Sequence, residues 1–373
     1  MKRMKSAVGL VLLVAALSQS SFGQAGSSAV PFLMISPNSR ASGMGEAGTG
    51  LADDAASIHW NPAGLAFQSG GEVSITHSNW LPQFNLSDLF YDYFNIKQEM
   101  PEYGGTFGSS ITYLNLGEFI ITSEKDPTEI GRFKGFEVAV TVGYGTQLSD
   151  EFGIGTNLRF INSSLSPIGT AQEQGDGIAN TFSFDIGFLY RPKSLVIPFL
   201  DEDIGEHFSI GMNLSNLGPK VTYIDAAQAD PLPTQLRLGF GIVPMKDEFN
   251  SLTIAVDFTK LMVYREKGTH GASHELPKSL ITSFTNNTLD DNLRFINRAL
   301  GLEYWYNKQV AIRFGRFWED PKNGNRNFYT FGAGLRYDIY GFDFSYISAN
   351  EENHPLSETL RFTLLILWGG MLQ

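Results

Sequence analysis

The chain has 373 residues, with 39 glycines, 29 phenylalanines and no cysteine, and 18% of its residues are charged. This glycine- and aromatic-rich composition is typical of packed strands joined by tight turns. The net charge of −12 repels phosphate backbones, which excludes nucleic acid as an expected partner. The absence of cysteine excludes disulfide scaffolds, cysteine-ligated metals and thiol nucleophiles.

Residues 1–23 have the features of a cleaved signal peptide. Basic residues precede an apolar run at 7–17, and the small residues Ser21 and Gly23 stand before an expected cleavage at Gln24. The run is shorter than the roughly 20 apolar residues of a membrane-spanning helix. We therefore expect an exported protein, and a buried N-terminal helix is the alternative.

Residues 24–66 show no regular alternation and are rich in Gly, Ala, Ser and Asp, with a helical candidate at 39–58. A segment this small cannot bury a core of its own. We therefore expect it to pack against the larger unit that follows, at 67–373.

From residue 73 onward, polar and apolar residues alternate with period 2, which predicts strands of a sheet with two unlike faces. One face carries aromatic and branched residues, and the other carries small residues interleaved with charges. Fourteen strands are expected, at 73–80, 107–114, 118–123, 136–145, 152–162, 182–190, 208–214, 236–242, 252–258, 300–306, 310–314, 331–339, 342–346 and 360–368.

The lengths of the connections favour a membrane barrel over a soluble β-sandwich. Long connections follow odd-numbered strands and tight ones follow even-numbered strands, including a tight turn at 115–117, and only 191–206 breaks this rule. Outer-membrane barrels have short periplasmic turns and longer extracellular loops. We therefore predict an all-β transmembrane barrel of about 14 antiparallel strands in the lipid of a Gram-negative outer membrane, and a soluble secreted β-protein is the alternative.

Ten charged residues fall on the small-residue face of the predicted strands. They are Glu137, Arg159, Asp185, Arg237, Asp257, Glu303, Arg313, Arg336, Asp343 and Arg361. Five acids and five arginines cancel, whereas an open selective pore carries a constriction of one sign. This favours a lumen filled by ion pairs around an inserted segment, and we expect 24–66 to be that hatch.

Two stretches of the expected hatch resemble a known family. The run at 29–37 precedes Arg40-Ala41-Ser42-Gly43-Met44-Gly45, and the segment ends in Trp60-Asn61-Pro62-Ala63-Gly64. Both resemble the PorV/PorQ family, outer-membrane components of the type IX secretion system within the FadL-like group of fourteen-stranded barrels. Residues 111–117 resemble the family's first periplasmic turn.

The resemblance implies a non-enzymatic role in protein secretion. The protein would receive cargo with a C-terminal signal from the translocon and deliver it to the surface attachment complex. A FadL-like transporter of long-chain or aromatic hydrophobic molecules is the alternative. The choice between PorV and PorQ stays open.

The expected first long connection, 81–106, is too apolar for a loop that meets only water. A short helix capped at 87–88 could run to residue 96. Exposed concentrations of aromatic side chains mark binding surfaces, and a lid over the barrel mouth is the alternative. The residues expected to bind a partner are Trp80, Phe84, Phe90, Tyr91, Tyr93 and Phe94.

No motif predicts catalysis, a metal site or a cofactor. Gly43, Gly45 and Gly48 have the spacing of a dinucleotide-binding turn, but no βαβ unit contains them. His270 and His274 lack the glutamate of the zinc motif, and no Gly-x-Ser-x-Gly nucleophile elbow occurs. A lipid-modifying enzyme is disfavoured because no nucleophile and base are found, so we expect no enzyme, no catalytic residues and no cofactor.

Overall fold

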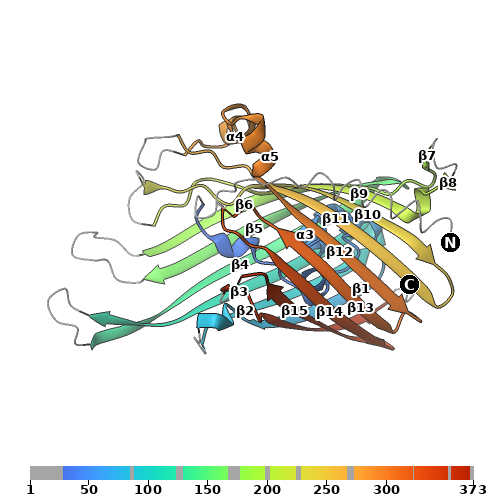
Figure 1. Cartoon of the computed structure of the whole chain (residues 1–373), viewed down its shortest axis with the longest axis horizontal. Helices are drawn as coiled ribbons and strands as arrows, with labels where there is room; N and C mark the ends of the chain where they lie inside the picture. Colours follow the sequence, from blue (N-terminus) through green and yellow to red (C-terminus); the bar gives the residue numbers. More distant parts are fainter. Residues whose placement is uncertain are drawn as a thin grey trace.

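The computed structural model describes residues 28–84, 88–122, 129–166, 177–197, 202–223, 228–266, 273–321, 323–351 and 354–369. The expected signal peptide, residues 1–23, lies outside them. Fourteen antiparallel strands pair in sequence order, and β1 pairs with β16 to close a barrel (Figure 1). The predicted all-β barrel of 14 strands is therefore confirmed.

The strands of the barrel are long enough to cross a membrane at a tilt. They are β1 (Gly71–Asn79), β2 (Phe90–Met100), β3 (Gly105–Thr122), β4 (Glu129–Ser149), β5 (Phe152–Ser166), β6 (Gly177–Tyr190), β9 (Phe208–Leu217), β10 (Gln235–Lys246), β11 (Asn250–Leu261), β12 (Ile296–Tyr306), β13 (Val310–Trp318), β14 (Phe328–Tyr337), β15 (Tyr340–Ala349) and β16 (Leu360–Trp368). A separate small sheet pairs β7 (Val196–Ile197) with β8 (Glu202–Asp203).

The strand count is right although two of the predicted elements are wrong. The expected loop at 81–106 contains β2, which pairs with β3 along its whole length and with β1 over residues 90–98. The expected turn at 115–117 lies inside β3, where Gly117 adopts φ 83° and shifts the pairing register with β4. Residues 111–117 are therefore no periplasmic turn, and the error that split β3 compensated for the missed β2.

The connections are sorted by length between the two ends of the barrel, as predicted. Tight turns join strands at 101–104, 150–151, 247–249, 307–309 and 338–339. The opposite end carries the longer connections, among them 218–234 and 262–295, and only 191–207 is long at the tight-turn end. We take the tight-turn end as periplasmic and the other end as extracellular.

Short helices lie in the connections at both ends of the barrel. The 262–295 connection holds α4 (Lys278–Thr285) and α5 (Leu289–Arg294), which stand beside the barrel near β11 and β12 (Figure 1). Three 3-10 helices lie in other connections: η3 (Pro82–Phe84), η4 (Pro101–Tyr103) and η5 (Gly205–His207). No helix in the described part of the chain is long and apolar enough to cross a membrane.

The two faces of the wall differ as the alternation predicts. Apolar side chains cover the outside, and Val142, Leu158, Ile312 and Leu364 are each more than half exposed there. On the inside, the ten charged residues that were predicted to point inward are buried or nearly so. An apolar outer band around a polar interior is the arrangement of outer-membrane barrels.

Residues 28–67 lie inside the barrel, drawn in blue in Figure 1. They form η1 (Pro31–Met34), α2 (Ser39–Gly43), α3 (Ser57–Trp60) and η2 (Pro62–Phe67), and we call them the N-terminal segment. Helix α2 contacts β13 to β16, and η2 contacts β3 to β6, on the other side of the lumen. The segment therefore bridges the lumen between opposite walls.

Candidate functional site: the occupied lumen and its mouth

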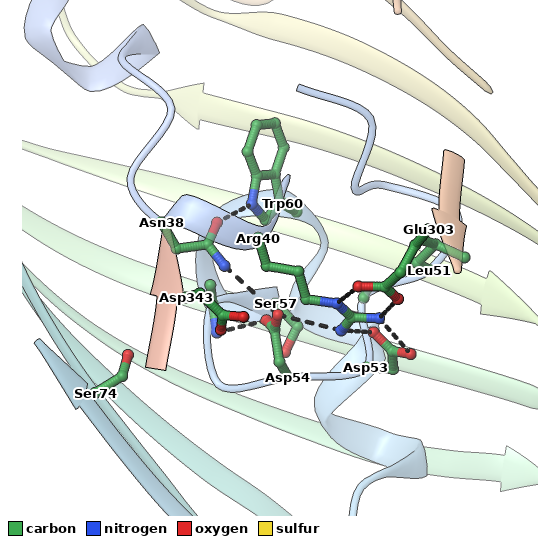
Figure 2. A network of polar contacts seen from close by, with 12 residues as sticks. Asn38, Arg40, Leu51, Asp53, Asp54, Ser57, Trp60, Ser74, Glu303 and Asp343 are labelled. Carbon is green, nitrogen blue, oxygen red and sulfur yellow. Dashed lines mark hydrogen bonds and ion pairs between the residues drawn. The ribbon is translucent and has the colours of Figure 1, made fainter. Parts of the chain in front are cut away.

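Arg40, on α2, is the centre of an ion-pair network between the N-terminal segment and the wall (Figure 2). Its Nε and Nη2 donate to the two carboxylate oxygens of Glu303 on β12, at 2.9 and 2.7 Å. Its Nη1 donates to Asp53 at 2.6 Å and to Asp54 at 3.3 Å. A bidentate arginine–carboxylate pair is a strong, directional contact, so Arg40 joins two parts of the segment to the wall.

The network continues along the wall beyond Glu303. Arg313 on β13 donates to Glu303 at 2.6 Å and to Asp343 at 2.7 Å, and Arg336 on β14 donates to Asp343 on β15 at 2.8 Å. The side chains of Glu303, Arg313 and Asp343 are at most 2% exposed. Buried charges of this kind depend on their partners to offset desolvation.

A second cluster lies on the opposite wall. Arg159 on β5 pairs with Asp185 on β6 at 2.8 Å, and Asn157 donates from Nδ2 to Asp185 at 2.8 Å and to the Ile58 carbonyl at 2.7 Å. All three wall side chains are buried. The N-terminal segment is thus held by polar contacts on both sides of the lumen.

The residues Trp60, Asn61 and Pro62 shape the end of the segment. The Asn61 Nδ2 donates to the Phe188 carbonyl on β6 at 3.0 Å, and Pro62 occupies the first turn of η2, where its missing N–H costs nothing. The Trp60 Nε1 donates to Asn38 Oδ1 at 3.2 Å, which ties α3 to the residue before α2. These contacts hold the end of the segment in place, and none of them arranges a side chain for catalysis.

The glycines Gly43, Gly45 and Gly64 also lie in the segment, packed between wall and backbone. Gly45 has φ 66°, and a Cβ there would lie 2.6 Å from the backbone nitrogen of Arg316. A Cβ on Gly64 would collide with the Ala52 carbonyl. Close approach to the wall at Gly45 therefore requires glycine, for conformation as well as for space.

Helix α2 also forms hydrogen bonds where β1 and β16 pair to close the barrel. The Ser39 N–H donates to Thr363 Oγ1 on β16 at 3.1 Å, and the two hydroxyl groups lie 2.9 Å apart. The same Thr363 hydroxyl bonds to Thr76 on β1 at 2.7 Å. One threonine thus connects the first strand, the last strand and the N-terminal segment.

The aromatic residues expected on a partner-binding loop are divided between two faces of β2. Tyr91 and Tyr93 point into the lumen, are each 1% exposed, and belong to one apolar cluster with Phe32 and Leu33 of the segment. They cannot meet an external partner, because the wall surrounds them. Tyr91 and Tyr93 therefore lie on the inner face of a strand, and the expectation that they belong to a partner-binding loop is wrong.

The other members of that set lie at the surface or at the barrel mouth. Phe90 and Phe94 face outward on β2, where Phe94 is 37% exposed. Trp80 is half-buried against the apolar cluster, with the Arg361 guanidinium 5.6 Å from its ring. Phe84 ends η3, and its side chain lies outside the described part of the structure.

A cavity of about 490 Å³ occupies the extracellular mouth of the barrel, above the N-terminal segment. Its walls are mostly apolar. They come from η1, from the extracellular ends of the strands and from four connections, and include Phe32, Met34, Ile35, Trp80, Leu81, Leu114, Leu116, Leu261, Phe295, Ile347, Pro355 and Leu356. Pockets of this size with apolar walls and a few polar groups bind organic ligands.

The polar groups of this mouth cavity include Glu46 and Arg361. Arg361 is 1% exposed, and its Nε and Nη1 have no hydrogen-bond partner in the described structure. Burial raises the pKa of Glu46 above its ordinary value, against the opposing charges of Arg326 and Arg361. A buried guanidinium with two nitrogens that lack a hydrogen-bond partner favours a ligand that carries a carboxylate or another anion.

The sequence predicted Arg361 and Glu137 as inward charges, but it did not indicate the other polar residues of the cavity, such as Glu46, Glu319 and Arg326. Arg326 donates to both carboxylate oxygens of Glu319 at 2.7 and 2.8 Å, in the connection between β13 and β14. Residues such as His354 come from another connection. No local pattern marks these residues, because loops distant in sequence meet only after the barrel closes.

The arrangement can bind a ligand, and nothing in it resembles a catalytic constellation. Within the described ranges, no group of three or more His, Cys, Asp or Glu side chains is placed to hold a metal ion. His270 of the predicted histidine pair lies outside these ranges, and His274 bonds to Thr282 and Glu266. Among the buried acids, Glu303 and Asp343 pair with Arg313, Asp257 accepts from a backbone N–H, and Glu137 accepts from the Ser163 hydroxyl at 2.8 Å.

Comparison with known proteins gives one family match. The family model described as type IX secretion system protein PorV matches residues 19–267. No curated protein sequence matches the chain.

Several solved structures are similar at low identity. The toluene transporter TbuX of Ralstonia pickettii is 12% identical, with a TM-score of 0.49, and the match covers 88% of this chain and 97% of that one. The toluene transporter TodX of Pseudomonas putida is 11% identical, with a TM-score of 0.49 and coverage of 94% and 98%. A FadL homologue of Pseudomonas aeruginosa is 11% identical, with a TM-score of 0.47 and coverage of 90% and 98%.

Proposed function

The chain belongs to the PorV family of type IX secretion system proteins, and from this premise we infer its function. Membership confirms the resemblance carried by the residues of the N-terminal segment, and the chain is an outer-membrane component of that system. We propose that it receives exported cargo with a C-terminal signal from the translocon and delivers it to the surface attachment complex. The proposal assigns no catalytic step to the chain.

The observation that supports this role is the mouth cavity. It opens at the extracellular end, while the lumen beneath it is occupied by the N-terminal segment and its ion pairs. A site closed below and open above is suited to holding a ligand at the cell surface. The end of a cargo chain offers apolar side chains for the walls and a terminal carboxylate for Arg361.

A second candidate function rests on the apolar walls of the same cavity. A long-chain or aromatic hydrophobic molecule would also fit walls built from Phe32, Leu114 and Leu116. For the protein to transport such a molecule, the N-terminal segment would have to move or the wall would have to open. Those steps would break the pairs of Arg40 or separate paired strands.

The test fills the cavity and leaves the barrel intact. Leu356→Trp places a larger side chain in the cavity, and Leu360→Trp is its control because Leu360 faces outward at the same end and is 37% exposed. We expect the Leu356 variant to lose cargo binding and secretion while it still co-purifies with the translocon. The control variant should keep all three.

Uptake of a fatty acid and of toluene, measured in the same strains, separates the two functions. If the Leu356 variant secretes cargo and binds its partners normally but takes up either molecule poorly, the secretion proposal is wrong and the transport alternative gains. If the variant secretes cargo normally and uptake is also unchanged, the cavity serves neither role.

A further inference from the structure

Three cations interrupt the apolar outer wall on adjacent strands, all at the extracellular end. Lys260 on β11, Arg298 on β12 and Arg316 on β13 occupy outward positions, because their neighbours Asp257, Glu303 and Arg313 point inward. Apart from Asn250 at the periplasmic end of β11, the remaining outward residues of these three strands are apolar or aromatic. A charge on a lipid-facing wall is costly unless it lies at headgroup depth or has a partner.

Lys260 already has protein partners. Its Nζ donates to Asn292 Oδ1 at 3.2 Å and lies 4.9 to 5.0 Å from the ring centroids of Phe284 and Phe295. The side chain is only 5% exposed beneath α4 and α5. The charges of the two neighbouring arginines, Arg298 and Arg316, remain to be explained.

Arg298 and Arg316 are diagonal neighbours on the outer face, because Arg298 pairs with Trp318 and Leu300 pairs with Arg316. Residues in diagonal positions have Cα atoms about 7–8 Å apart. Arg298 has no hydrogen bond or ion pair within the described part of the chain, although Asp320 acts on it electrostatically. Arg316 bonds through Nη1 to Asn350 at 2.7 Å, which leaves its other N–H groups available.

Aromatic rings place this pair at the membrane surface. The Arg316 guanidinium lies 4.1 Å from the Tyr329 ring centroid and 5.3 Å from that of Trp318. Tryptophan and tyrosine gather at the interfaces between hydrocarbon and water. Toward the periplasm, the wall continues with Leu302, Ile312 and Phe314, and Ile312 is 64% exposed.

We propose that Arg298 and Arg316 bind the phosphate group of an outer-leaflet lipid whose acyl chains lie along β12 and β13. Guanidinium groups are strong hydrogen-bond donors to phosphate, and two of them at diagonal positions lie above exposed apolar residues that suit acyl chains. The site lies outside the barrel and is separate from the mouth cavity. It therefore stands whether or not the proposed cargo role is correct.

The test measures lipid binding to the full chain in dodecylmaltoside, with bisphosphorylated lipid A as the probe. Arg298→Gln combined with Arg316→Gln removes the site. The matched control, Arg132→Gln combined with Lys193→Gln, removes two exposed cations elsewhere. Heat-dependent gel migration verifies that each variant is folded, and the single Arg298→Gln variant replaces the double variant if the latter does not fold.

We expect native mass spectrometry to show lipid A bound to the wild type and to the control. Each cation near an anionic membrane surface contributes about 1 kcal/mol. Binding to the double variant, which lacks two cations, should therefore be roughly 30-fold weaker. Lipid A without phosphates should bind weakly to every form. The proposal is wrong if the site variant binds like wild type, if the control loses as much, or if inorganic phosphate at the same concentration as the lipid displaces it.

Discussion

Replacing Arg40 with methionine tests whether the ion-pair network holds the N-terminal segment in the lumen. Methionine keeps most of the length of the side chain and removes the guanidinium. The change leaves Glu303, whose side chain is 1% exposed, without the two hydrogen bonds at 2.7 and 2.9 Å. Asp53 and Asp54 lose their contacts with Arg40 as well.

The expected loss of stability depends on the contacts that the acidic residues keep in the variant. Removing one partner of a buried pair costs about 3–5 kcal/mol, because it leaves an uncompensated charge. Glu303 keeps Arg313 at 2.6 Å, and Asp53 is 43% exposed, so water can solvate it. We therefore expect a loss near the lower end of that range, about 3 kcal/mol. The control Arg132→Met, at a solvent-exposed pair with Glu129, should lower the stability far less, because exposed ion pairs contribute little.

Two measurements check this. Urea unfolding in detergent, monitored by gel migration, should show a lower midpoint for the Arg40 variant than for the Arg132 variant. In planar bilayers the Arg40 variant should show openings that wild type lacks, because a less strongly held segment leaves the lumen more often. If the two variants unfold at the same midpoint and both stay closed, the network does not hold the segment.

Two further changes test the packing inside the barrel. Gly45→Ala should destabilise the barrel by about 1–3 kcal/mol more than Gly104→Ala, because both glycines have positive φ but only at Gly45 would a Cβ meet the wall; equal urea midpoints would contradict the close approach. Tyr91→Ala should cost about 3–5 kcal/mol by leaving a cavity beside Phe32, whereas Phe94→Ala on the outer face should cost less in the same assay; the reverse order would place Tyr91 outside the core.

The strands could be predicted wherever the two faces of the wall differ in chemistry. Along β4 and β5, aromatic and branched residues alternate with small residues and with Glu137 and Arg159, which keeps the period visible. In β2 the pattern fails, because Tyr91 and Tyr93 face inward between the outward Phe90 and Phe94. The inner face is aromatic there because it packs on the apolar part of the N-terminal segment.

The division of β3 into two strands has another physical cause. The run from Asn115 to Gly117 has the composition of a tight turn, yet the structure uses Gly117 for a bulge in a continuous strand. The inward charges could be predicted because inward and outward positions alternate along the strands that carry them. Their partners on the N-terminal segment, such as Arg40 with Glu303, were not, since the segment follows no period that fixes its orientation.

The bond between Ser39 and Thr363 has a consequence for the order of folding. The two residues are 324 positions apart in the chain, so their contact cannot form until nearly the whole protein has been exported. Contacts of such sequence separation are slow, because the entropy of closing the loop is lost before any contact compensates for it. Thr363 also joins β1 to β16, so the N-terminal segment gains this bond only in a barrel whose last strand has been added. A chain truncated before β16 would therefore lack this bond, and only contacts with the remaining strands, such as Arg40 with Glu303, would hold its N-terminal segment.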